Sequence, residues 1–208
     1  MNDTTPEPEP RIPRSIGDEF ARRDARNTLI AWRRSMDVQV RCTADAAIAA
    51  RLDAWLHGWC ATRMHGAREV LGVYWPVRGE PDLRAPMSGW HRAGHVIALP
   101  RVAAGGGALE FGRWTPASAL RVADFGIPLP EPFVPLTPTL LIVPCVGFDQ
   151  RGYRLGYGGG HYDRTLAAHG LPAVGVAYDG CELVRFVAGG HDRPMTAIVT
   201  ETRTITPP

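Results

Sequence analysis

Apolar residues recur at helical spacing in the first part of the chain and predict a helix from Asp18 to about Met36. Asp18 can cap this helix, because its carboxylate accepts hydrogen bonds from the free N–H groups of the first turn. The residues that share its apolar face are Ala25, Leu29, Trp32 and Met36. Three arginines lie on an adjacent face, within roughly 40° of each other by helical geometry: Arg22, Arg26 and Arg33. Such a row is consistent with a solvated basic face or with a site for an anion.

A second helix and a series of strands follow. The helix is predicted after Thr43, and its core side is marked by Ile48, Leu52, Trp55, Leu56 and Trp59. Apolar runs predict strands at 70–75, 95–100, 109–114, 140–143, 173–177 and 197–200. Glycines at 103–107 predict a hairpin turn between the second and third of these strands. Prolines in 126–138 predict an extended connection.

This alternation of helices and strands predicts an α/β fold, namely a single three-layer α/β/α domain over residues 16–204. Its sheet is expected to be mixed and mostly parallel, with a small antiparallel portion near residues 95–114. A chain of 208 residues is long enough to bury one full core. Residues 1–15, rich in proline and acidic side chains, are predicted to form a flexible tail.

The composition narrows the range of functions. The formal net charge of +2 is too small to indicate a nucleic-acid partner. All basic residues are arginine, which excludes Schiff-base chemistry and the phosphate loop that requires Gly-Lys-Ser/Thr. The four cysteines are far apart and lack a Cys-x-x-Cys pair, so neither a zinc site nor a disulfide framework is expected. No apolar run reaches about 18 residues and no signal-peptide pattern opens the chain, so we expect a cytoplasmic protein without a membrane partner.

A glycine-rich segment at residues 154–164 carries the most chemistry, with the sequence R-L-G-Y-G-G-G-H-Y-D-R. It lies between a predicted strand and a predicted helix, where ligands gather beyond the carboxyl ends of parallel strands. Glycines let a large anion approach backbone N–H groups, and a helix N-terminus adds partial positive charge. Arg154 and Arg164 suit phosphate oxygens, and Asp163 suits a divalent cation. The segment therefore indicates a metal–nucleotide site, although a tight connection is the commoner use of such glycines.

This segment and the ten residues before it resemble the signature of the 5-formyltetrahydrofolate cyclo-ligase family. Family members carry P-x-x-x-F-D-x-x-G-x-R-L-G-Y-G-G-G-Y-Y-D-R, and this chain reads P-C-V-G-F-D-Q-R-G-Y-R-L-G-Y-G-G-G-H-Y-D-R over 144–164. Weaker resemblances extend over most of residues 18–201. They include a Lys/Arg-x-x-x-Arg pair on the first helix. The resemblance implies that ATP is bound by Arg22, Arg26, Arg154, Gly156, Tyr157, Gly158, Gly159, Gly160, His161 and Tyr162.

Two further segments resemble the family. Residues 74–82 are similar to Y-x-P-x-x-x-E-[VI]-[DE], which implies folate contacts from Val77, Glu80, Asp82 and Tyr157. Residues 191–201 are similar to H-D-x-P-x-D-x-[IV]-[VI]-T-E, which implies that Asp192 and Asp163 hold Mg²⁺. The chain departs from the family at two positions, because His161 replaces a tyrosine and Thr196 replaces an aspartate. We expect His191 to be a structural hydrogen-bonding residue.

The resemblance implies an ATP- and Mg²⁺-dependent ligase that converts 5-formyltetrahydrofolate to 5,10-methenyltetrahydrofolate, ADP and phosphate. Phosphoryl transfer needs positioning and charge neutralisation rather than a covalent nucleophile, and we expect no Ser-His-Asp or Cys-His arrangement. The partners would be a reduced folate and ATP, without nucleic acid, and the protein is expected to be a monomer. Two alternatives stay open at this point: a non-catalytic relative that binds folate or nucleotide, and a nucleic-acid binder that uses the arginines of the first helix.

Overall fold

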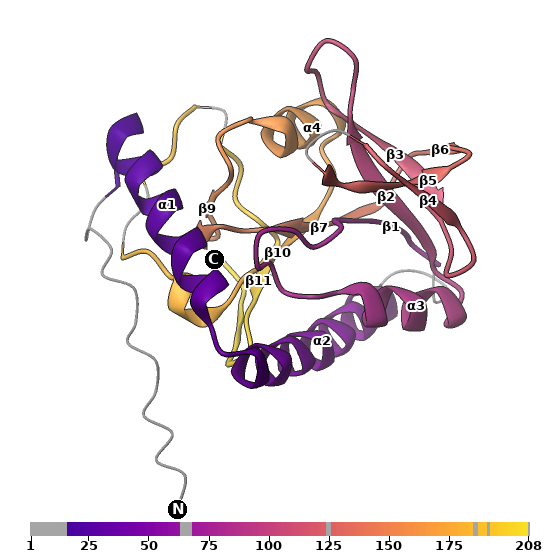
Figure 1. Cartoon of the computed structure of the whole chain (residues 1–208), viewed down its shortest axis with the longest axis horizontal. Helices are drawn as coiled ribbons and strands as arrows, with labels where there is room; N and C mark the ends of the chain where they lie inside the picture. Colours follow the sequence, from indigo (N-terminus) through magenta and orange to yellow (C-terminus); the bar gives the residue numbers. More distant parts are fainter. Residues whose placement is uncertain (1–15, 63–67, 124–125, 185–186, 191, 208) are drawn as a thin grey trace, which may run out of the picture.

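The computed structural model describes residues 16–62, 68–123, 126–184, 187–190 and 192–207. Within these ranges the chain forms a mixed sheet of eight strands in the order β12-β11-β10-β7-β1-β2-β3-β6 (Figure 1). The strands of this sheet are β1 (Val70–Val73), β2 (Val96–Val102), β3 (Leu109–Trp114), β6 (Pro135–Leu136), β7 (Leu140–Pro144), β10 (Ala173–Val176), β11 (Ala197–Val199) and β12 (Thr204–Ile205). The predicted tail at 1–15 lies outside the described residues.

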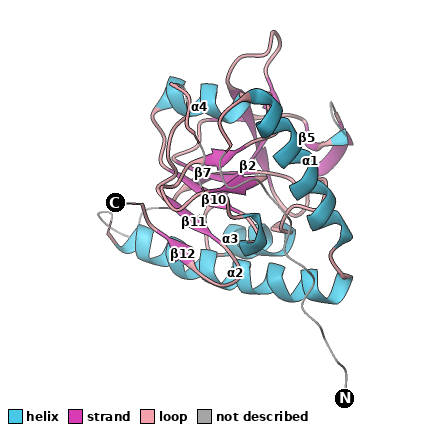
Figure 2. Ribbon diagram, turned by 90° about the vertical axis from the view of Figure 1, so that its left-hand side faces the viewer, coloured by secondary structure: helices cyan, strands magenta, loops and turns pink. Residues whose placement is uncertain are grey.

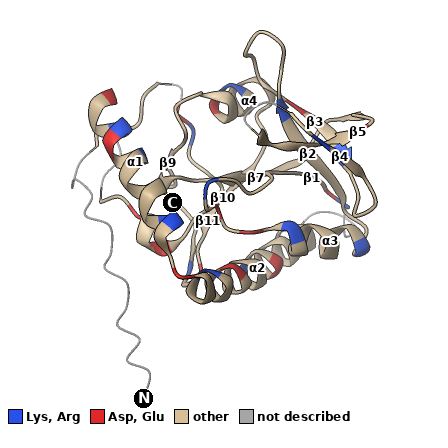
Figure 3. Ribbon diagram, in the orientation of Figure 1, with Lys and Arg blue, Asp and Glu red and all other residues tan. Residues whose placement is uncertain are grey.

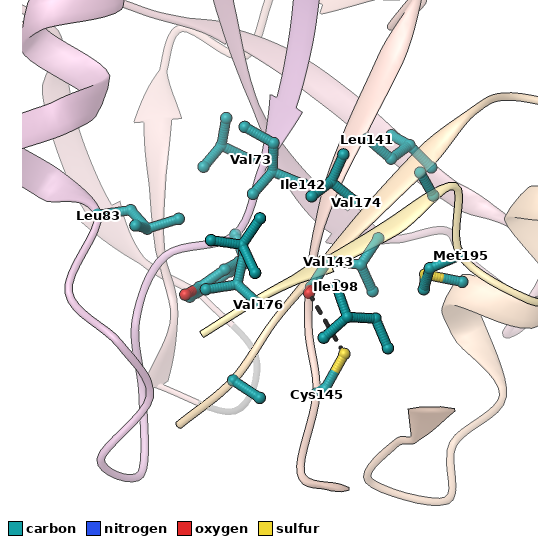
Figure 4. Packing of buried hydrophobic residues seen from close by; sticks show 14 of the residues in the cluster. Val73, Leu83, Leu141, Ile142, Val143, Cys145, Val174, Val176, Met195 and Ile198 are labelled. Carbon is teal, nitrogen blue, oxygen red and sulfur yellow. Dashed lines mark hydrogen bonds between the residues drawn. The ribbon is translucent and has the colours of Figure 1, made fainter. Parts of the chain in front are cut away.

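The centre of the sheet is parallel. Strand β7 pairs in parallel with β1 on one side and with β10 on the other, and β2 and β11 continue this parallel set outward. Every residue of β7 is buried, as is usual for a strand covered on both faces. Side chains of β7, β10 and β11 pack against one another and against Met195 (Figure 4). Cys145 belongs to this core, where burial raises the pKa of its thiol to about 12.

Antiparallel strands close both edges of the sheet. Strands β2 and β3 form the predicted hairpin, with Ile97 opposite Trp114, and β12 pairs antiparallel with β11. Helices α2 (Val38–Ala61) and α3 (Arg84–Arg92) cover one face, and α4 (His161–His169) covers the other (Figures 1 and 2). The prediction of a three-layer α/β fold with a mostly parallel mixed sheet is therefore confirmed. None of the helices in the described ranges combines the length and apolar character that a membrane crossing requires.

Helix α1 (Glu19–Ser35) lies beside the carboxyl ends of the central strands rather than against a face of the sheet (Figure 1). Asp18 caps it as predicted, accepting a 2.7 Å hydrogen bond from the backbone N–H of Ala21. The helix packs closely on the loops that leave β7 and β10. A Cβ atom at Gly147 would lie 2.9 Å from Leu29, and one at Gly180 would lie 2.5 Å from Trp32. These glycines let α1 approach the sheet and bring its polar face to the carboxyl ends of the strands.

Some predicted boundaries are wrong. Helix α2 begins at Val38 rather than after Thr43, because Asp37 accepts hydrogen bonds from the N–H groups of Gln39 and Val40. Helix α3 was not predicted. The extended connection predicted at 126–138 contains β5 (Pro128–Glu131), which pairs with β4 (Ala119–Val122), and also contains β6. Prolines suit such short strands because they lie at sheet edges.

Candidate functional site

A cavity of about 990 Å³ lies beyond the carboxyl ends of β1 and β7. Tyr74 and Trp75 line it directly after β1, and Pro144 lines it at the end of β7. The chain leaves the parallel set in opposite directions from these two strands, since β2 lies on one side and β10 on the other. Ligands of open α/β sheets bind at such a switch point. The predicted site residues that line the cavity are Arg22, Arg26, Val77, Glu80, Arg154, Gly156, Tyr157, Gly158, Gly159, Gly160, His161, Tyr162, Asp163 and Asp192.

The glycine loop, residues 156–160, joins β9 (Arg154–Leu155) to α4. Gly158 and Gly160 have φ angles of 93° and 63°, which side chains rarely adopt, and Gly160 is the N-cap of α4. The helix therefore begins at the cavity with a residue that has no side chain, which leaves its first N–H groups available to an anion. Arg164 holds the loop from outside, because it donates to the carbonyl of Gly159 at 2.8 Å.

Helix α4 is fixed against the sheet by a buried threonine. Thr165 accepts a 2.8 Å hydrogen bond from the backbone N–H of Leu109 in β3 and donates to the carbonyl of His161. Before the loop, Asp149 accepts from the backbone N–H groups of Arg151 and Tyr153, which closes the turn between β8 (Gly147–Phe148) and β9. Asp149 of the family signature is thus placed as a structural residue of this turn.

Each arginine predicted to bind ATP lies next to a carboxylate. Arg26 donates to Glu19 at 2.7 Å and, through Nε, to the carbonyl of Gly156 at 2.8 Å. Both terminal nitrogens of Arg154 donate to the same oxygen of Asp163 at 2.8 Å. Arg22 and Asp192 are 3.7 Å apart. Acidic and basic residues therefore lie side by side near the cavity, as on α1 in Figure 3.

The two predicted magnesium ligands, Asp163 and Asp192, line the same cavity. Asp192 is held by the backbone N–H of Gly189 at 2.6 Å, and Asp163 by Arg154. Across the ranges that the structure describes, no group of three or more His, Cys, Asp or Glu residues is arranged to hold a metal ion. Mg²⁺ commonly takes one or two carboxylates and completes its coordination with phosphates and water. The chemistry of this donor set fits Mg²⁺ that arrives with a nucleotide.

A polar cluster lies at another wall of the cavity, where Glu80 is buried and Tyr157 is partly exposed. The hydroxyl of Tyr157 donates to Glu80 at 2.5 Å and accepts a hydrogen bond from Arg33. Glu80 also accepts from the backbone N–H of Val77 at 2.8 Å. Desolvation raises the pKa of Glu80, while the Tyr157 hydroxyl and the Arg33 charge act to lower it. Desolvation and the neighbouring Glu80 also raise the pKa of Tyr157, so its hydroxyl stays protonated at neutral pH.

Asp82 is the predicted site residue that the structure does not bring to the cavity. Its carboxylate accepts from the backbone N–H and the side chain of Arg84, at the start of α3. Thr196 is also outside the cavity lining, and its hydroxyl accepts from the backbone N–H of Ala173. The replacement of aspartate at position 196 thus leaves the described lining of the cavity intact. His191 lies outside the described residues.

The sequence patterns missed two groups of residues. Arg33 is buried beneath the cavity, and the helical angle that grouped it with Arg22 and Arg26 gave no sign of its depth. The far end of the cavity is lined by residues of the hairpin and of β4 and β5, for which no sequence signal was found: Arg101, Val102, Glu110, Arg121 and Leu129.

Residues 19–201 match the sequence profile of the 5-formyltetrahydrofolate cyclo-ligase family. The chain belongs to this family. A 5-formyltetrahydrofolate cyclo-ligase of Mycolicibacterium smegmatis is 34% identical over 164 residues, which cover 72% of this chain and 82% of that protein. The Escherichia coli K12 protein of the same name is also 34% identical, over 64% of this chain and 79% of its own length.

Solved structures agree with this assignment. The 5,10-methenyltetrahydrofolate synthetase of Aquifex aeolicus superposes with a TM-score of 0.74 at 28% identity, covering 89% of this chain and 92% of that one. A 5,10-methenyltetrahydrofolate synthetase from Mycoplasma pneumoniae shares the fold, with a TM-score of 0.69 at 19% identity over 86% of this chain and 98% of its own. The family resemblance of the sequence is thereby confirmed.

Proposed function

We propose that this protein is a ligase that converts 5-formyltetrahydrofolate to 5,10-methenyltetrahydrofolate, using ATP and releasing ADP and phosphate. The observation that carries the proposal is a cavity in which a glycine loop with arginines lies beside the cluster of Glu80 and Tyr157. The glycine loop and its arginines suit a polyphosphate, and the cluster of Glu80 and Tyr157 suits a ring that is rich in hydrogen-bond donors. The names of the relatives point to the same reaction.

The nucleotide phosphates would bind at the glycine loop. Arg22, Arg26 and Arg154 supply positive charge there, and the first N–H groups of α4 supply donors. Binding would exchange the carboxylate partners of these arginines for phosphate oxygens. Because the arginines are already held by backbone carbonyls and carboxylates, little side-chain entropy is lost when phosphate arrives.

We propose Asp163 and Asp192 as the ligands of Mg²⁺, which would neutralise charge on the phosphates when bound. Asp163 lies in the first turn of α4, where the helix dipole stabilises a carboxylate. Only one of its oxygens takes the recorded hydrogen bonds of Arg154 within the described residues.

The reduced folate would bind beside Glu80, with Val77 and Tyr157 lining its site. A carboxylate inside a largely desolvated wall accepts strong hydrogen bonds from the N–H groups of a pterin ring. Asp82 lies elsewhere, and our proposal for the folate site therefore rests on the other three residues.

The reaction proceeds in two steps that need no protein nucleophile. The formyl oxygen attacks the γ-phosphorus, the bond to the departing ADP breaks, and an activated imidoyl phosphate forms. The second folate nitrogen then attacks the formyl carbon, loses its proton, and the carbon–oxygen bond to phosphate breaks. The protein's part is to hold the two substrates in line and to offset negative charge as it moves. Arg154, buried next to the glycine loop, is suited to that second task.

The test is a turnover assay with purified protein, ATP, Mg²⁺ and 5-formyltetrahydrofolate, in which the absorbance of the methenyl product is followed. Asp163→Asn should lower kcat by roughly a hundredfold or more, the usual cost of losing a positioned charge in a phosphoryl-transfer site. Asparagine keeps the shape of the side chain and limits the disturbance of Arg154.

Asp24→Asn is the matched control, because Asp24 is an exposed carboxylate on α1 away from the cavity lining. It should leave turnover unchanged. Absence of product with the unmodified protein would contradict the proposed function, whereas full activity of Asp163→Asn would contradict only the metal assignment.

A cytoplasmic location and a monomeric state stay predictions, as does the lack of a nucleic-acid or membrane partner. Cys42, Cys145 and Cys181 are free thiols, which is usual in a reducing compartment. The expected binding partners are small molecules, namely the reduced folate and ATP.

A further inference from the structure

Arg33 is a buried cation at the meeting point of three segments of the site. It belongs to α1, and its side chain is 1% exposed. Its Nε donates to the carbonyl of Arg78 at 2.9 Å, and its Nη2 donates to the hydroxyl of Tyr157. It also lies 3.9 Å from Glu80. It therefore joins α1 to the segment after β1, which contains Arg78 and Glu80, and to the glycine loop, although it does not line the cavity itself.

Stability alone does not explain an arginine at this position. A buried charge is costly unless it is fully paired, and Nη1 of Arg33 has no hydrogen-bond partner among the described residues. An apolar residue would continue the stripe of Ala25 and Leu29 without that cost. The groups that Arg33 does bind are instead two residues of the cavity wall, Tyr157 and Glu80, and the backbone next to a third, Val77.

The contacts of Arg33 fix geometry as well as charge. Arg78 has a φ of 52°, a left-handed conformation unusual for arginine, and its carbonyl is held by Nε of Arg33. The Tyr157 ring is approached by two guanidinium groups, with Arg33 at 5.5 Å and Arg78 at 5.3 Å from its centroid. Both cations can attract its π face. The orientation of the ring and of the turn before Glu80 thus depends on Arg33.

We propose that Arg33 is a positioning residue of the ligase reaction, which acts through Tyr157 and Glu80 to keep the folate wall (Val77, Glu80 and Tyr157) oriented. This inference rests on the proposed function of the same site. Because Arg33 does not line the cavity, we assign it no direct contact with either substrate. Its loss should therefore impair folate recognition more than it impairs ATP binding at Arg22 and Arg26.

The charge state of Glu80 gives a second readout. The titratable and charged groups that face Glu80 come from several elements. They are Arg33 on α1, Tyr74 and Arg78 in the segment between β1 and Glu80, Cys145 after β7, Tyr157 in the glycine loop and Tyr162 on α4. Arg33 and Arg78 favour the ionised form. Removing the Arg33 charge leaves the desolvation less opposed and raises the pKa of Glu80 further. The acid-side fall in kcat/KM for folate should then begin at higher pH.

The experiment compares Arg33→Gln, Arg33→Lys and the control Arg34→Gln in the turnover assay. Arg34 is the exposed neighbour on the same helix, and its variant should behave as the unmodified protein. Arg33→Gln should raise KM for the folate roughly tenfold, as expected for a lost hydrogen bond to a charged group, with a smaller change in KM for ATP. Arg33→Lys should keep the acid limb near its original pH, because it keeps the charge.

A double-mutant cycle with Tyr157→Phe separates positioning from a general loss of structure. If Arg33 acts through the Tyr157 hydroxyl, Arg33→Gln should have a much smaller effect in the Tyr157→Phe background. Additive effects, or equal rises in KM for both substrates, would overturn the inference. Should Arg33→Gln fail to fold, the same cycle with Arg33→Lys decides the question. An unmodified protein without turnover would instead refute the proposed function.

Discussion

At the scale of single residues, the positive charge of the arginines at the nucleotide end of the cavity is balanced by neighbouring carboxylates. Glu19 holds Arg26, Asp192 lies near Arg22, and Asp163 holds Arg154. Asp163 and Asp192 have a proposed role with the metal. Glu19 has no proposed role with the metal, and its carboxylate accepts from Nη1 of Arg26, an arginine that we expect to bind phosphate.

We therefore predict that Glu19→Gln lowers KM for ATP. The hydrogen bond from Arg26 and the Arg26 charge lower the pKa of Glu19, so this carboxylate is ionised throughout the neutral range and competes with phosphate for the same guanidinium. Because Glu19 is largely exposed, the gain should be small, about twofold to fivefold. Steady-state kinetics at varied ATP measure it, with Asp24→Asn as the control for charge on the same helix. An unchanged or higher KM would show that the pair with Glu19 helps rather than hinders the nucleotide.

Residue types predicted much of this site because its chemistry restricts them. Phosphate groups favour arginines and glycines, and the structure brings Arg22, Arg26 and the glycine loop to one cavity. Arg33 was grouped with the two other arginines of its helix by angle alone. Helical geometry gives the direction of a side chain but not the depth of the element behind it, so the burial of Arg33 could not be read from the sequence.

At the scale of elements, the glycine loop is restricted by its backbone and by its neighbours. A Cβ atom at Gly158 would lie 3.4 Å from the guanidinium of Arg26, and the backbone there has a φ of 93°. We predict that Gly158→Ala raises KM for ATP several-fold and lowers the free energy of unfolding by about 1 kcal/mol, the usual strain of an alanine in this conformation. Kinetics at varied ATP and chemical denaturation measure the two effects.

Gly105→Ala provides the matched control for this prediction. Gly105 has a similar φ of 87°, and no atom lies within 4 Å of a Cβ atom built there. This variant should lose comparable stability and keep KM for ATP. If the two variants behaved alike in ATP kinetics, the contact between the loop and Arg26 would have no part in binding.

The buried strands of the parallel set were easier to predict than helix boundaries. Leu140–Pro144 is buried throughout, and its apolar run is visible in the sequence. The start of α2 was missed because Val38 and Val40 are exposed β-branched residues, which weaken a helical pattern. Helix α3 contains Gly89, which is unfavourable in a helix interior, yet Met87 and Trp90 anchor the helix in the core. Tertiary packing overrides local preference in α3, whereas the Asp37 cap sets the start of α2.

At the scale of the whole molecule, topology explains why distant segments form a site. Parallel strands end at one edge, so the segments after β1 and β7 meet there, and α1 covers them from the N-terminal part of the chain. The far wall, made by the β2–β3 hairpin with β4 and β5, could not be foreseen in the same way. Its position depends on edge pairings of short strands, which the hydrophobic pattern specifies weakly.

Ligand binding should be visible in the stability of the intact protein, which gives the last prediction. A ligand that binds only the folded state at a hundred times its Kd stabilises that state by about 2.7 kcal/mol. For a domain of this size that corresponds to a rise in Tm of roughly 5–10 °C. We expect such a rise with ATP and Mg²⁺ together and with 5-formyltetrahydrofolate alone, and little change with Mg²⁺ alone, because phosphates must complete its coordination.

The combination of thermal shift and turnover also distinguishes the proposed ligase from the two alternatives, a non-catalytic relative and a nucleic-acid binder. A ligase should be stabilised by each substrate and should form the methenyl product. A regulatory relative would show the same rises in Tm without forming product. In its Asp163→Asn variant, only the rise with the folate would remain. A nucleic-acid binder would show neither shift, but a stabilisation by oligonucleotides that falls steeply with added salt. The folate wall and the glycine loop share one cavity, and Tyr157 belongs to both, so the two bound substrates would be neighbours. We therefore expect the stabilisations to be coupled, so that the shift with both ligands differs from the sum of the two single shifts.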